Sequence, residues 1–194
     1  MKKLTIISAI LIILVSCGKK SDNGMENFTK IDSKDIEGNF IEKMADDWAL
    51  ITAGTAEKFN TMTASWGLIG HLWNKPVAVC FVRPQRYTFE FMEAADTFTL
   101  SFFDENYRDA LNICGTLSGR DVNKVEKAGL TPLVLDTNSI SFGEARMIIE
   151  CRKIYADFFN PEKFIDAKIP AEIYPTNDFH KAYIGEIINV WVKK

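Results

Sequence analysis

One apolar run and the residues after it constrain the fold more than any other part of the chain. Val77–Val82 is uninterrupted by polar side chains and rich in β-branched residues, which is typical of a buried central strand. Pro84 follows almost at once, keeps the residue before it extended, and is tolerated as the first residue of a helix. Tyr87 and Phe91 then recur at helical spacing. We therefore expect a strand that gives way to a helix over about 85–95.

Upstream of this run, small hydroxyl side chains alternate with packing side chains. A strand over 61–68 places the two kinds on opposite faces. The hydroxyl face carries Thr61, Thr63 and Ser65, and the other carries Met62, Ala64 and Trp66. A face of hydroxyls backed by packing residues suits a strand that lines a polar site. A solvent-exposed edge strand has the same pattern, and this alternative stays open.

Two arginines, a phenol and a hydroxyl lie where the strand gives way to the expected helix. They are Arg83, Arg86, Tyr87 and Thr88. Helix N-terminal amides attract anions, and the guanidinium group offers forked donors that match phosphate oxygens. The segment therefore predicts a phosphate-binding site, and surface arginines in ion pairs are the alternative.

The rest of the chain indicates a mainly β protein with inserted helices. Further strands are expected at about 49–56, 97–103, 140–158 and 182–192, and a helix is expected between Asp104 and Gly115. Regular βα alternation is missing, and so are the GxGxxG and GxxxxGK[ST] motifs, so neither a Rossmann fold nor a P-loop is supported. We expect an antiparallel β-barrel with helical excursions, in the α+β class.

The N-terminus resembles a bacterial lipoprotein signal peptide. Lys2 and Lys3 precede an apolar stretch over 4–15 that is too short to span a bilayer. Leu14-Val15-Ser16-Cys17 resembles the lipobox, whose cysteine is lipidated. We expect residues 1–17 to be the signal peptide with Cys17 lipidated, 18–27 a flexible tether, and 28–194 the folded domain. The protein is then held at the membrane of the bacterial cell envelope through its lipid anchor only; a buried N-terminal helix is the alternative.

Charge and cysteine content exclude some classes of function. The formal net charge of −3 lacks the basic footprint of a nucleic-acid-binding protein. Besides Cys17 the chain has Cys80, Cys114 and Cys151, an odd number without a CxxC pattern, so core positions are expected. No His and Cys cluster has metal-ligand spacing, and no metal is expected.

An ordered set of segments resembles the flavin reductase-like, flavoredoxin-type FMN-binding family. The set comprises Asn60–Gly67, Arg83–Thr88, Ser101–Phe103, Ser118–Asp121, Asp178–His180 and Tyr183–Ile187. This resemblance covers about residues 40–194. It implies an antiparallel split barrel of Greek-key type, FMN as the cofactor, and a homodimer with FMN near the subunit interface.

The same resemblance implies roles for individual residues. The segment from Met62 to Trp66 is expected against the isoalloxazine and ribityl chain, with Asn60 also at the cofactor. Arg86, Tyr87 and Thr88 are expected in the phosphate cradle with Arg83 close by, and His180 is expected to approach the flavin from the late part of the chain.

The resulting hypothesis is an FMN-dependent oxidoreductase, expected to be a flavin reductase that uses NAD(P)H. Hydride transfer through a flavin needs no side-chain nucleophile or general base, and the sequence shows no convincing triad or carboxylate pair, so no catalytic residue is assigned. Two other hypotheses stay open: an electron carrier that docks to a membrane redox partner, and a cofactor-free binding module.

Overall fold

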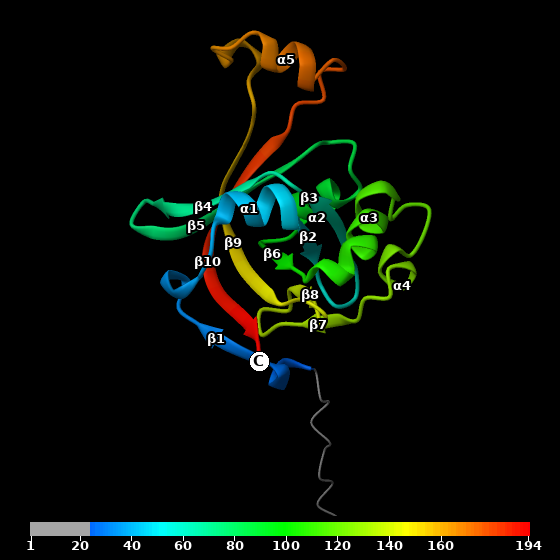
Figure 1. Ribbon diagram of the computed structural model, residues 1–194. Coiled ribbons are helices and arrows are strands. Elements are labelled where there is room, and N and C mark those ends of the chain that lie inside the picture. The colour runs from blue at the N-terminus through cyan, green and yellow to red at the C-terminus, as the bar shows by residue number, and fades with distance from the viewer. Residues whose placement is uncertain (1–23) are drawn as a thin grey trace, which may run out of the picture.

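Residues 24–194 are described by a computed structural model, and their main feature is an eight-stranded antiparallel sheet (Figure 1). The signal peptide, Cys17 and residues 18–23 of the predicted tether lie outside the described residues. The path of the sheet is β3-β2-β6-β9-β10-β5-β4, and β1 also pairs with β10. These strands are β1 (Phe28–Ile31), β2 (Ala49–Gly54), β3 (Phe59–Ala64), β4 (Gly67–Leu72), β5 (Lys75–Val82), β6 (Thr97–Phe102), β9 (Met147–Phe158) and β10 (Lys181–Lys193). The expected mainly antiparallel β fold is confirmed.

Two further strands and the helices cover the sheet and connect its strands. β7 (Pro132–Val134) and β8 (Ile140–Phe142) form a separate hairpin. The α-helices are α1 (Phe40–Glu42), α2 (Thr88–Ala94), α3 (Arg108–Thr116), α4 (Lys124–Lys127) and α5 (Lys168–Ile173). Short 3-10 turns span Met25–Asn27, Ser33–Asp35, Glu105–Tyr107 and Pro161–Lys163, and a π-helical turn spans Lys43–Asp47. None of the helices in residues 24–194 is long and apolar enough to cross a membrane.

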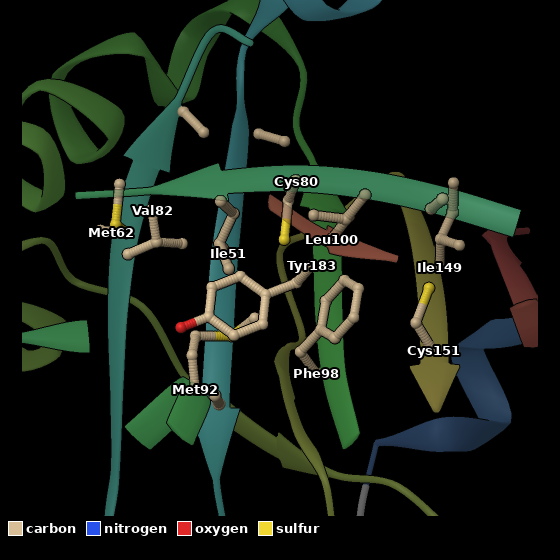
Figure 2. Close-up of a cluster of buried hydrophobic side chains, with 14 of the residues drawn as sticks. Ile51, Met62, Cys80, Val82, Met92, Phe98, Leu100, Ile149, Cys151 and Tyr183 are labelled. Carbon is tan, nitrogen blue, oxygen red and sulfur yellow. The ribbon is translucent and has the colours of Figure 1, made fainter. Parts of the chain in front are cut away.

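The main core lies within the curved sheet. Tyr183 of β10, Phe98 of β6 and Met92 of α2 are almost fully buried there, and Figure 2 shows their side chains gathered in one interior. Cys80 and Cys151 belong to the same cluster, and Cys114 is buried in a second cluster under α3. The expectation that these cysteines are core residues is confirmed.

The long strands β9 and β10 carry an arm that rises from the sheet. Residues 159–180 connect the two strands and project away from the barrel with α5 near the tip (Figure 1). The base of the arm is closed by a hydrogen bond from the Phe159 amide to the His180 carbonyl, 3.0 Å. An aromatic cluster of Phe164, Tyr174 and Phe179 holds the arm together, with ring centroids 4.7–6.1 Å apart.

Several local expectations are wrong. Val77–Val82 is not among them, since it forms most of β5, which is largely buried and pairs with β10 on one side and with β4 on the other. The expected strand over 61–68 ends at Ala64, and Gly67 starts β4. Residues 25–27, expected in the tether, form a 3-10 turn whose Asn27 carbonyl accepts from the Lys194 amide.

Candidate functional site

The link between β5 and α2 positions the predicted phosphate-binding residues. The Arg86 amide donates to the Arg83 carbonyl at 3.1 Å, and the Phe89 amide donates to the Arg86 carbonyl at 2.9 Å. These bonds form a turn, so α2 begins at Thr88 instead of Gln85 as the sequence predicts. The helix is only seven residues long, and the anion-binding capacity of the segment therefore rests on its side chains more than on a helix dipole.

A cavity of about 400 Å³ opens beside this turn, and we call it the phosphate lobe. Its lining contains three cationic side chains and no carboxylate, which favours an anionic ligand. The lining residues are Met62, Arg83, Gln85, Arg86, Tyr87, Thr88, Thr116, Leu117, Ser118, Gly119 and Lys124.

Arg86 and Lys124 are the two cations of this lobe that form no ion pair with a carboxylate of residues 24–194. Arg86 donates to the Gly115 carbonyl at 2.7 Å. Lys124 is buried, and its ammonium donates to the carbonyls of Thr61 and Cys114. Burial lowers the pKa of Lys124 to about 8; Cys114 opposes this shift in part, and the charge of Arg86 lowers the pKa by a smaller amount. An anion in the lobe would offset this loss of solvation.

Arg83 pairs with a carboxylate of the arm, whereas the sequence predicted that it lies close to a bound phosphate. It forms an ion pair with Asp178 at 2.5 Å and donates to the Ile173 carbonyl at 3.0 Å, so it ties the arm to the end of β5. Hydrogen bonding to Arg83 holds the pKa of Asp178 well below its usual range. Arg83 borders the phosphate lobe, but its guanidinium is already engaged by the arm.

A second, smaller cavity of about 180 Å³ adjoins the first, and we call it the ring lobe. It is lined by Met62, Thr63, Ala64, Ser65, Trp66, Phe81, Arg83, Arg86 and His180. Met62, Arg83 and Arg86 line both lobes. The two lobes therefore form one elongated site with a cationic end and an end that carries aromatic side chains.

His180 joins the ring lobe from the base of the arm. Its ring centroid lies 5.2 Å from that of Trp66, which also lines the lobe and is 47% exposed. Nδ1 of His180 lies 2.8 Å from the Tyr174 hydroxyl, which leaves Nε2 as the ring nitrogen available to a ligand. Burial, assisted by the charge of Arg83, lowers the pKa of His180 to about 4. The imidazole is therefore neutral at pH 7.

The predicted hydroxyl face lines the site only in part, because Thr63 and Ser65 line the ring lobe and Thr61 lines neither lobe. Thr61 is fully buried, where its hydroxyl accepts from Thr52 at 2.9 Å and donates to the Ile51 carbonyl at 3.2 Å. The Thr63 hydroxyl donates to the Leu111 carbonyl of α3. The hydroxyls of Thr61 and Thr63 are therefore bound by the neighbouring strand and by α3, and Met62 and Ala64 of the opposite face line the ring lobe as well.

Asn60 also differs from the expectation, because it lines neither lobe. It borders a larger cavity of about 830 Å³ on the other side of the loop before α4. Lys58, Arg120 and Lys124 line that cavity together with Glu57, Asp121 and Glu126, so it lacks the charge bias of the phosphate lobe. Tyr87, Thr88 and the remaining predicted residues lie at the elongated site.

Sequence reasoning missed the residues supplied by the segment after α3. Leu117, Ser118 and Gly119 reach the phosphate lobe from this segment, and Lys124 follows at the start of α4. Ser118 and Gly119 belong to one of the segments that resemble the flavin reductase-like family, and this resemblance could have identified them as site residues. Lys124 had no signal, because a single lysine in a short polar helix is normally solvated.

Comparisons with known proteins identify the family. The family model described as a flavin reductase like domain matches residues 41–194. The chain belongs to the flavin reductase-like family. A comparison with curated protein sequences found no significant match. The family match spans β2 to β10 and includes every residue of both lobes.

Solved structures similar to this member of the flavin reductase-like family share its fold. Flavoredoxin from Methanosarcina acetivorans has 19% identity and a TM-score of 0.60, over 76% of this chain and 69% of its own. The FMN-binding protein from Thermus thermophilus has 20% identity and a TM-score of 0.59, over 84% and 80%. The NADH:FAD oxidoreductase of Streptomyces globisporus C-1027 has 14% identity and a TM-score of 0.57, over 74% and 73%. The expected split-barrel fold is confirmed.

Proposed function

We propose that this member of the flavin reductase-like family binds FMN in the elongated site and acts as an NAD(P)H-dependent flavin oxidoreductase. The observation that carries the proposal is the charge of the phosphate lobe, where Arg86 and Lys124 face one cavity that no carboxylate lines. A phosphate monoester satisfies two such cations in one place. The names of similar structures, an FMN-binding protein and an NADH:FAD oxidoreductase among them, support a flavin.

The residues present fit such a ligand along the whole site. Arg86 and Lys124 would hold the phosphate, with hydroxyl donors from Thr88 and Ser118 in the same lobe. The segment from Met62 to Trp66 would lie along the ring. An elongated molecule with a dianionic end and a flat end matches a site whose two ends differ in this way.

The bound flavin would supply the redox chemistry, and the chain would bind, orient and shield it. His180 is neutral at pH 7, so it can form a hydrogen bond through Nε2 without adding charge to the ring lobe. Tyr174 fixes the orientation of this imidazole from the arm. Trp66 lines the ring lobe beside His180 and would offer an aromatic surface to the ring of the ligand.

Two spectroscopic measurements test the proposal. Mature protein is expected to show flavin absorbance as purified or after FMN is added, and colourless protein that gains none contradicts flavin binding. NADH or NADPH added under anaerobic conditions is expected to bleach the oxidised-flavin band rapidly. Flavin that binds but stays oxidised favours the electron carrier instead, which the predicted envelope location also favours because nicotinamide nucleotides are cytoplasmic reductants.

Flavin affinity is expected to depend on pH through Lys124. Its pKa near 8 lies below the usual value of 10.5, and a bound phosphate favours the protonated form, so FMN affinity should fall as pH rises through 8. The loss should be roughly tenfold between pH 7 and 9, where the phosphate itself stays dianionic. Fluorescence titration measures it.

Lys124→Arg and riboflavin provide the controls for this pH dependence. Arginine stays protonated over the whole range, so the variant should bind FMN with little change between pH 7 and 9. Riboflavin has no phosphate and should show no such fall in the wild type. An equal fall for riboflavin would assign the effect to another group.

The homodimer and the lipid anchor stay predictions of the sequence. Exposed apolar side chains on the arm, Ile165 and Ile169, and on the β4–β5 hairpin, Leu68 and Trp73, support self-association. Light scattering of the mature protein measures the first, and mass spectrometry of the N-terminal peptide at Cys17 measures the second.

A further inference from the structure

Asn60 forms a hydrogen bond with the hydroxyl of Thr88, a residue that lines the phosphate lobe. It lies on β3 with its side chain almost fully buried, and its Nδ2 donates to the Thr88 hydroxyl oxygen at 2.7 Å. Thr88 is equally buried at the start of α2 and lines the phosphate lobe. Asn60 itself lines only the larger neighbouring cavity, so it acts on the lobe through Thr88.

This hydrogen bond determines what the hydroxyl can offer to a ligand. A hydroxyl has one proton and two acceptor lone pairs. Because Thr88 accepts from Asn60, its own proton remains available, and it donates to no other group in residues 24–194. A buried donor without an acceptor costs free energy, and a phosphate oxygen in the lobe would remove that cost.

Gly119 leaves the space that the amide oxygen of Asn60 occupies on the other side. A Cβ at position 119 would lie 2.1 Å from Oδ1 of Asn60 and 3.1 Å from the Tyr87 ring. The backbone of Gly119 is not in the left-handed region, so the glycine is required for space and not for its dihedral freedom. With Oδ1 against Gly119, the donor end of the amide faces Thr88.

We infer that Asn60 and Gly119 hold the Thr88 hydroxyl as a hydrogen-bond donor to the ligand's phosphate, and that this arrangement selects phosphorylated flavins over riboflavin. The inference rests on the proposed flavin binding and adds to it two positioning residues and a specificity. Neither residue is expected to contact the flavin ring, so the effect should be confined to the phosphate.

A double-mutant cycle measured with two ligands tests the inference. Asn60→Asp replaces the donor by an acceptor that takes the Thr88 proton for itself. We expect FMN affinity to fall by about tenfold, as for loss of a hydrogen bond to a charged group, while riboflavin affinity changes less than about twofold. In a Thr88→Val background, which has no hydroxyl to reorient, the same change should cost clearly less.

The Thr88→Val background distinguishes two causes of weaker FMN binding, namely reorientation of the Thr88 hydroxyl and direct repulsion of the phosphate by the new carboxylate. An equal loss in both backgrounds, or an equal loss for FMN and riboflavin, overturns the inference while FMN binding stands. Asn60→Leu gives a second cycle without a new charge if the Asp variant folds poorly, with an expected loss of about threefold for FMN alone. Wild-type protein that binds neither ligand would overturn the proposed function together with this inference.

Discussion

Arg86→Ala is expected to weaken FMN binding by roughly 10- to 100-fold and to leave riboflavin binding nearly unchanged. Loss of a charge-assisted hydrogen bond to phosphate costs about 1.5–3 kcal/mol, and Arg86 is the forked donor of a lobe without carboxylates. Lys124 remains in the variant as a single point charge, so binding should be reduced and not abolished. Fluorescence titration with both flavins at pH 7 gives the two affinities.

Arg152→Ala is the matched control for this substitution. Arg152 lies on β9, is exposed, pairs with Glu186 at 2.8 Å and lines neither lobe. Its removal should leave FMN affinity within experimental error of the wild type. Unchanged FMN affinity in Arg86→Ala would remove the phosphate from this lobe and favour the cofactor-free binding module.

Gly185→Ala is expected to destabilise the folded protein by about 3 kcal/mol, although only one methyl group is added. Gly185 lies on β10 at a register shift against β9. A Cβ there would lie 2.6 Å from Cε1 of Phe98 and 2.7 Å from the Cβ of Cys151. Both neighbours are fully buried and cannot move aside without disturbing the core, because protein interiors are close-packed. Urea denaturation with an unchanged m-value measures the loss.

Gly70→Ala is the control for the size of the residue and for the strand. Gly70 lies on β4, where a Cβ would meet nothing within 4 Å. Alanine should be neutral or slightly stabilising there, since glycine in a strand is unfavourable by about 0.5–1 kcal/mol. Equal shifts of the urea midpoint in the two variants would contradict the account of the packing around Gly185.

Patterns within short segments were sufficient for most of the secondary structure. β2, β6 and β10 lie close to the expected ranges, and the strand expected at 140–158 is present as the two strands β8 and β9. The stripe of Ala110, Leu111 and Cys114 in α3 is buried as its spacing indicates. These features follow from side-chain period and β-branched content, which act over a few residues and depend little on the rest of the chain.

Part of the site could be predicted because several of its residues are neighbours along the chain. Arg86, Tyr87 and Thr88 are neighbours in sequence and remain neighbours in the phosphate lobe. Met62 to Trp66 form one wall of the ring lobe because the turn from β3 to β4 keeps them together. The family match covers all of them, which agrees with the resemblance of the ordered segments.

By itself, the sequence determined an antiparallel β fold, its family, and the approximate position of the segment that is proposed to bind phosphate. Only the tertiary structure decided which polar groups face the two lobes of the candidate site. Asp178 of the arm forms an ion pair with Arg83, and the Leu111 carbonyl of α3 accepts the hydrogen bond of the Thr63 hydroxyl. Lys124 at the start of α4 lines the phosphate lobe. The physical reason is that a side chain of one type can satisfy a protein partner or a ligand equally well, and packing of distant segments decides which partner lies within about 3 Å.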